Sequence, residues 1–134
     1  MSLSEDSYRA MEILRFLRRA SSSDPWTAKE LAVAIEVDDG GITSQLRPLY
    51  HFDEARENRE GIHGRIKEIV ARREEETQPV PSLAGVRSTL KILRGHRWVE
   101  AARGKGFWLS EAGRSVTLLE VLHACGEDIG IVRC

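Results

Sequence analysis

The chain has 134 residues, of which 41% are hydrophobic and 31% charged, and its formal net charge is −1. This hydrophobic content can supply a folded core and excludes a wholly disordered chain. No apolar run is long enough to span a membrane, no signal-peptide core follows the N-terminus, and two cysteines are too few for a disulfide scaffold. We therefore expect a single cytoplasmic domain over residues 1–134.

The first quarter of the chain predicts two helices. Apolar residues recur at helical spacing over Ser7–Ala20, and the Ser21–Pro25 run ends that helix. A second helix begins at Thr27, because a Thr three residues before Glu30 forms a capping box. A turn is predicted over Asp38–Gly41.

Residues 38–81 carry 10 acidic and 7 basic side chains and form an inserted segment that includes a helix over 62–76. Its apolar residues are Ile62, Ile66, Ile69 and Val70. Because such an apolar edge must be buried, we expect this helix to serve in dimerisation or docking. Pro79 and Pro81 separate it from the next element.

The following residues predict a helix and then a hairpin. The helix covers 82–95, with Ser82 as its N-cap. Two short strands at 97–102 and 107–110 flank the turn Arg103–Gly106. Short helical segments follow at 111–114 and from Ser115 or Thr117 to Leu122. The expected fold class is mainly α with a small β-hairpin, in the order of a winged helix-turn-helix with a recognition helix at 82–95 and a wing at 97–110.

Positive charge is concentrated in this part of the chain. Residues 82–114 contain seven basic and two acidic side chains, although the whole chain is slightly negative. Such a local excess indicates a polyanionic partner, here double-stranded DNA. An ordinary solvated face and a solubilising turn remain alternatives, and at least one face of Trp98, Phe107 and Trp108 is expected to pack in the core. The candidate DNA-binding residues are Arg87, Ser88, Lys91, Arg94, Arg103 and Lys105.

A rival recognition helix lies in the string ELAVAIEVDDGGITSQLRPL, which also has the spacing of a helix-turn-helix. It would expose Thr43, Ser44, Gln45 and Arg47. Pro48 counts against it, because proline inside a helix removes a hydrogen bond and clashes with the preceding turn. Pro48 fits better at the start of another helix over 49–58.

Four segments resemble the Rrf2 family of bacterial transcription regulators: LSEDSYRAMEILRFL, TAKELA, VRSTLKILRGHRWVEAARG and SVTLLEVLHACGEDIGIVRC. The resemblance implies a homodimeric DNA-binding regulator. Some members bind an iron–sulfur cluster through three closely spaced cysteines, of which Cys134 would match the first. The chain departs from the family in the insertion at 38–81, in Arg97 at a usual glycine position, in a shorter wing, and in ending at Cys134 without the family's long C-terminal helix.

We expect no cofactor and no metal in this chain. A cluster would require a longer chain that continues beyond Cys134, and Cys125 is expected to be structural. The histidines His51, His63, His96 and His123 lack tight metal-ligand spacing and are expected at the surface or at helix caps, with His96 a candidate for phosphate contact. No phosphate-binding loop or nucleophile motif is present, so we expect no enzyme.

Two other functions stay open. The chain could be a winged-helix protein-interaction module that has lost or masked DNA binding, or a truncated redox or metal sensor. The packing of residues 38–81 discriminates the first from DNA binding. Burial of Arg87 and Lys91 favours interaction, and an open face shared with Arg103 and Lys105 favours DNA.

Overall fold

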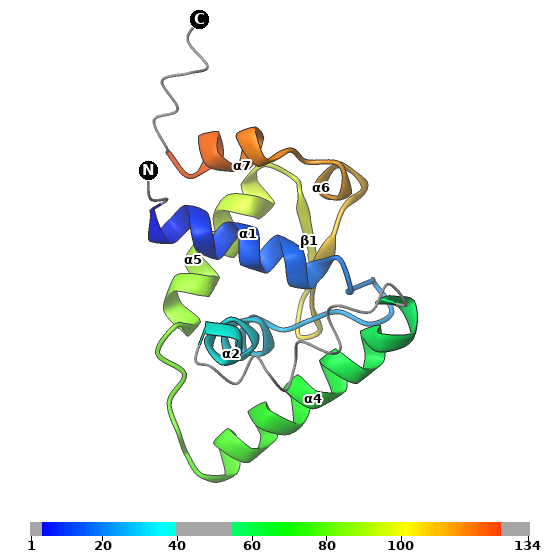
Figure 1. Cartoon of the computed structure of the whole chain (residues 1–134), viewed down its shortest axis with the longest axis vertical. Helices are drawn as coiled ribbons and strands as arrows, with labels where there is room; N and C mark the ends of the chain where they lie inside the picture. The colour runs from blue at the N-terminus through cyan, green and yellow to red at the C-terminus, as the bar shows by residue number, and fades with distance from the viewer. Residues whose placement is uncertain (1–3, 40–54, 127–134) are drawn as a thin grey trace, which may run out of the picture.

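The computed structural model describes residues 4–39 and 55–126, and it is mainly helical with a two-stranded antiparallel sheet, as the sequence predicts (Figure 1). In chain order the elements are α1 (Glu5–Leu17), α2 (Ala28–Asp39), α4 (Ala55–Glu75), α5 (Leu83–Gly95), β1 (Val99–Ala102), β2 (Gly106–Leu109), α6 (Glu111–Arg114) and α7 (Leu118–Ala124).

Side-chain caps fix most of the helix starts. The predicted box at α2 is present: the Glu30 N–H donates to Thr27 Oγ1 at 3.1 Å, and the Thr27 N–H donates to Glu30 Oε1 at 2.8 Å. Ser4 caps α1, so this helix runs from Glu5 to Leu17 rather than over the predicted Ser7–Ala20. Ser82 is the N-cap of α5, as predicted, but its side chain makes no capping bond. Its hydroxyl instead donates to the Ala32 carbonyl oxygen at 3.4 Å and so joins the start of α5 to α2.

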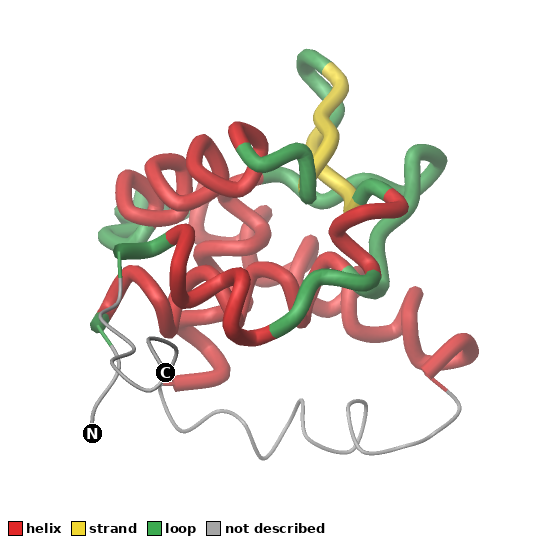
Figure 2. Tube along the Cα trace, turned by 90° about the horizontal axis from the view of Figure 1, so that it is seen from above, coloured by secondary structure: helices red, strands yellow, loops and turns green. Residues whose placement is uncertain are grey.

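Helices α1, α2 and α5 contact one another and enclose the core. Their inward faces supply fully buried residues such as Phe16, Leu31 and Leu93. Such burial contributes roughly 1.5–3 kcal/mol per large apolar side chain. Helix α7 packs against α1. The tip of the hairpin projects beyond the helices (Figure 2).

The hairpin is held against the helical core at Trp26. The register pairs Val99 with Leu109 and Ala101 with Phe107. On the other side of β2, the Trp26 N–H donates to the Phe107 carbonyl at 3.0 Å, and the Phe107 N–H donates to the Trp26 carbonyl at 2.7 Å. Gly106 has a φ of 137°, and a Cβ there would lie 2.6 Å from the Trp26 carbonyl oxygen. Glycine is therefore required for this close approach.

Helix α4 packs on α2 rather than presenting a free apolar edge (Figure 1). Ile66 is fully buried, and Ile69 and Val70 are half-buried against the core. Ion pairs join Lys29 Nζ to Glu74 Oε1 at 3.1 Å and Arg73 Nη1 to Glu36 Oε2 at 2.9 Å. The prediction that this edge must be buried is met by α2 at Ile66, and a role of 62–76 in dimerisation stays a prediction.

Two predicted boundaries in this region also change. Helix α2 continues through Asp38 and Asp39, where a turn was expected, because its contacts with α4 and α5 override the weak helix propensity of aspartate. Pro48 and the rival segment 43–47 lie outside the described residues, as do residues 49–54 of the helix expected at 49–58. Residues 55–58 belong to α4.

The C-terminus of α5 is a Schellman motif with an unusual residue at its left-handed position. The Trp98 N–H donates to the Leu93 carbonyl at 3.1 Å, and the Arg97 N–H donates to the Arg94 carbonyl at 2.9 Å. Arg97 has a φ of 63°. Glycine is the usual residue there because an L side chain in this conformation costs roughly 1–2 kcal/mol.

We predict that Arg97→Gly raises the free energy of unfolding by about 0.5–1 kcal/mol, since relief of this strain exceeds the entropy that glycine gives to the unfolded chain. Urea unfolding measures the change. Arg97→Ala is the matched control, because it removes the charge and keeps the strained Cβ. Equal stability of the two variants would contradict this explanation.

Candidate nucleic-acid interface

The exposed side of α5 carries a row of positive side chains. Val86, Leu90 and Leu93 are buried, which turns Arg87, Lys91 and the rest of the opposite face to solvent. Arg87, Lys91 and Arg94 follow one another at intervals of four and three residues, so they share one helix face. Arg87, Ser88, Lys91 and Arg94 are all exposed, as predicted.

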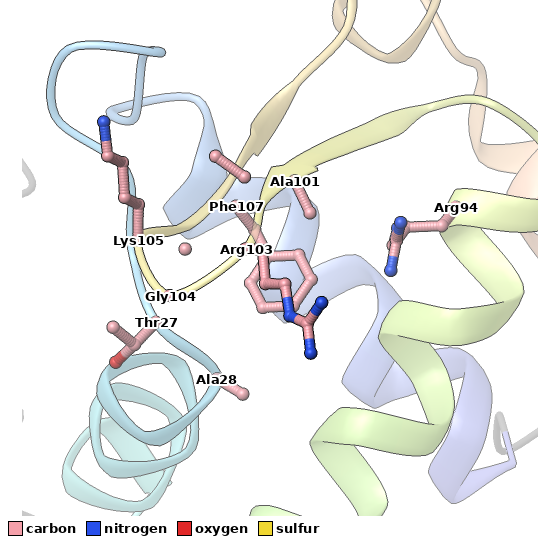
Figure 3. A pocket seen from close by; sticks show the side chains of 10 residues that line it. Thr27, Ala28, Arg94, Ala101, Arg103, Gly104, Lys105 and Phe107 are labelled. Atoms are coloured by element: carbon pink, nitrogen blue, oxygen red, sulfur yellow. The ribbon is translucent and has the colours of Figure 1, made fainter.

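Arg94, at the C-terminal end of this row, lines a hollow of about 620 Å³ between α5, the hairpin turn and the start of α2. Figure 3 shows the Arg94 and Arg103 side chains entering the space between α5 and the hairpin, while Lys105 points to the other side of the turn. The remaining lining includes Thr27, Phe107 and the backbone of Gly104. The fold thus brings three predicted residues of two different elements to one hollow.

None of the described residues that line this hollow is acidic. The acidic residue of the hairpin, Glu100, pairs across the strands with Trp108 and accepts a hydrogen bond from its Nε1 at 2.9 Å. Alternate residues of a strand face opposite ways, so this pair lies on the face away from Ala101 and Phe107. Trp98 is buried, which confirms core packing for one face of the hairpin.

The positive charge of this surface is not neutralised by neighbours. Among the side chains that the structure describes, no ion pair involves the five cations Arg87, Lys91, Arg94, Arg103 and Lys105. Uncompensated charges of one sign around a hollow add to a local positive potential that attracts anions.

The described part of the inserted segment does not cover the α5 row. Helix α4 contacts α2, and Arg87 and Lys91 are exposed. Arg94, at the end of the same row, lines the hollow with Arg103 and Lys105. In the described part of the chain, Arg87 and Lys91 are thus exposed on the helix whose C-terminal end lines the hollow.

A buried polar cluster that the sequence did not predict joins α4 to the start of α2. His63 was expected at the surface or at a cap, yet only 2% of its side chain is exposed. Its ring stacks on Trp26, with centroids 4.3 Å apart. Its Nδ1 lies 3.1 Å from Asp24 Oδ1, and its Nε2 lies 2.9 Å from Glu30 Oε1. The spacing of His63 from Ile66 and Val70 places it on the buried stripe and is the signal that could have found it.

Glu30 is the carboxylate shared by the cap and the cluster. Burial by itself raises the pKa of Glu30, but the hydrogen bonds from His63 and the Thr27 N–H, with the nearby charges of His63 and Lys67, bring that pKa below its usual value. The group is therefore held as a carboxylate, in contact with both α4 and the residue that opens α2.

The cysteine and metal expectations are only partly within the described residues. Cys125 is half-buried after α7, with its thiol 3.8 Å from the Asp6 carbonyl oxygen, and Cys134 and His51 lie outside the description. His96 and His123 are exposed, and His96 stacks on Trp98. In the described part of the chain, no group of three or more His, Cys, Asp or Glu side chains is placed to hold a metal ion.

Comparison with protein-family models, with curated proteins and with solved structures finds no significant match. The likeness to the Rrf2 family thus rests on the four sequence segments alone. No helix of the described residues is long and apolar enough to cross a membrane.

We predict that Glu30→Gln lowers the free energy of unfolding at neutral pH by about 1–3 kcal/mol, because glutamine keeps the capping bond and loses the charged contact with His63. A lowered folded-state pKa stabilises the fold above the unfolded-state pKa, and this contribution is lost as the pH falls through the folded-state value. The difference between the two proteins should therefore close in acid, as measured by urea unfolding at several pH values.

Glu120→Gln is the matched control, since Glu120 holds the same position in the exposed capping box of α7. It should have little effect. An equal loss in both variants, or a Glu30→Gln loss that does not change with pH, would show that Glu30 acts only as a cap.

Proposed function

We propose that this protein is a winged helix-turn-helix regulator of Rrf2-like type that binds duplex DNA and controls transcription. In this proposal α2 and α5 are the helix-turn-helix pair, α5 is the recognition helix, the β1–β2 hairpin is the wing, and α4 belongs to an insertion between the two helices. The observation that carries the proposal is the hollow that Arg94 of α5 and Arg103 of the hairpin turn both enter, with Lys105 on the same turn and no acidic side chain among the described lining residues.

The chemistry of the exposed row suits a DNA groove. A major groove about 12 Å wide admits one helix, and arginine can make paired hydrogen bonds to a guanine edge. Arg87, Ser88 and Lys91 supply the groups for base or phosphate contacts on such a helix. Arg103 and Lys105 flank a glycine at the hairpin tip, where the backbone can approach a phosphate or enter a minor groove.

The resemblance supports two further parts of the proposal. Rrf2-like regulators are dimeric, and a dimer would read two half-sites about 34–36 Å apart on one face of the duplex. A cytoplasmic location accords with a regulator of transcription. A protein-interaction module is the second candidate, and the exposure of Arg87 and Lys91 weighs against the version in which the insertion masks α5.

We predict that the logarithm of the affinity for random-sequence duplex DNA falls linearly with the logarithm of salt concentration, with a slope of about −0.9 for each phosphate neutralised. Arg94→Ala and Arg103→Ala should each reduce the magnitude of this slope by about one, because each removes one cation from the hollow. Fluorescence anisotropy of labelled duplex at several salt concentrations measures both quantities.

Arg72→Ala is the control, since Arg72 is an exposed cation on α4 that forms no ion pair with the described residues. It should leave the slope unchanged. Absence of binding at low salt would overturn the proposed function, and equal effects of Arg72→Ala and Arg94→Ala would move the interface away from the hollow.

A further inference from the structure

Each ring nitrogen of His63 faces a carboxylate oxygen. Nδ1 lies 3.1 Å from Asp24 Oδ1 and Nε2 lies 2.9 Å from Glu30 Oε1. A neutral imidazole has one N–H donor and one lone pair, so it can donate to only one of these acceptors. The imidazolium donates to both, and it is the form that satisfies this geometry.

The other charged group at this cluster is Lys67, which also lies on α4. Its Nζ is 4.0 Å from Asp24 Oδ1 and exposed. The groups facing His63 are therefore the carboxylate of Asp24 from the loop before α2, the carboxylate of Glu30 from α2, the Lys67 ammonium from its own helix and the apolar ring of Trp26. His63 thus has a carboxylate oxygen at each ring nitrogen, and the Lys67 ammonium lies on the exposed side of the cluster.

Loss of the ring proton would affect the two contacts unequally. The Glu30 side chain is 10% exposed, and the Asp24 side chain is 35% exposed. A buried carboxylate without a hydrogen-bond donor is costly, so the N–H that remains on the His63 ring would keep donating to Glu30. A lone pair would then face Asp24, which can turn to water. The bond that is lost is the one between α4 and the loop before α2.

This cluster is connected to the hollow by two short paths. The Trp26 ring stacks on His63, and the Trp26 main chain exchanges two hydrogen bonds with Phe107. Glu30 bonds both His63 and the Thr27 N–H. Thr27 and Phe107 both line the hollow that holds Arg94, Arg103 and Lys105.

We propose that protonation of His63 clamps α4 onto the loop before α2, and that this clamp controls the shape of the hollow, so that anion binding there weakens when His63 loses its proton. His63 is a positioning residue in this scheme, since it acts through Trp26 and Glu30. The coupling to DNA rests on the proposed function, whereas the clamp does not.

The clamp is tested by urea unfolding of the full chain between about pH 5 and 8, where histidines change charge. Asp24→Asn is the informative variant, because its amide can donate to the lone pair of a neutral ring and so removes the need for the second proton. As the pH rises, the unfolding equilibrium constant of the wild type should increase about tenfold relative to that of Asp24→Asn. If the ratio of the two unfolding equilibrium constants stays constant with pH, the proposed clamp is overturned, because a His63 with a merely structural role would give that result. His63→Gln, where it folds, should lack the same pH dependence.

The coupling is tested with the same two proteins and random-sequence duplex DNA at fixed salt. Between about pH 5 and 8, the wild type should lose several-fold more affinity than Asp24→Asn, because the exposed histidines contribute equally to both. Parallel affinity curves together with diverging stability curves would overturn the coupling. Absence of binding by either protein at either pH would overturn the proposed function, and the stability ratio would still decide the clamp.

Discussion

Trp26 is fully buried, and its ring and main chain hold different parts of the molecule together. The ring contacts Phe16 of α1, at a centroid distance of 5.6 Å, and His63 of α4, at 4.3 Å. The main chain exchanges two hydrogen bonds with Phe107, and Gly106 leaves room for this approach. Three elements from distant parts of the sequence therefore take their positions from one residue. The placement of the hairpin cations opposite α5 depends on that contact.

The charge distribution follows from which acidic groups already have partners. Glu74 and Glu36 are engaged by Lys29 and Arg73 where α4 meets α2, and Glu100 is held by Trp108 on the far face of the hairpin. These acidic residues thus attach α4 to α2 and hold Trp108 on the hairpin. The cations of α5 and of the hairpin turn remain without ionic partners in the described residues, so a chain with a net charge of −1 can present a strongly positive face.

Local patterns in the sequence predict the elements well because their causes are local. The Thr27–Glu30 box, the apolar stripe of α5 and the glycines of the hairpin turn act within a few residues, and the exposure of Arg87 and Lys91 follows from that stripe. The bonds of His63 to Asp24 and Glu30 span 39 and 33 residues and depend on how α4 docks. The meeting of Arg94 with the hairpin turn likewise depends on the contact between Trp26 and Phe107. Spacing along the chain could place His63 on a buried stripe, but it could predict neither the partners of His63 nor the meeting of Arg94 with the hairpin turn.

The central claim is that the exposed row of α5 and the hairpin turn form one surface that contacts DNA. Amide chemical shifts of the labelled protein, followed as random-sequence duplex is added, test it most directly. The account predicts that the largest changes fall on residues 87–94 and 103–105, together with Thr27 and Ala28 at the edge of the hollow. Changes confined to α1 and α7, or no changes at low salt, would contradict it.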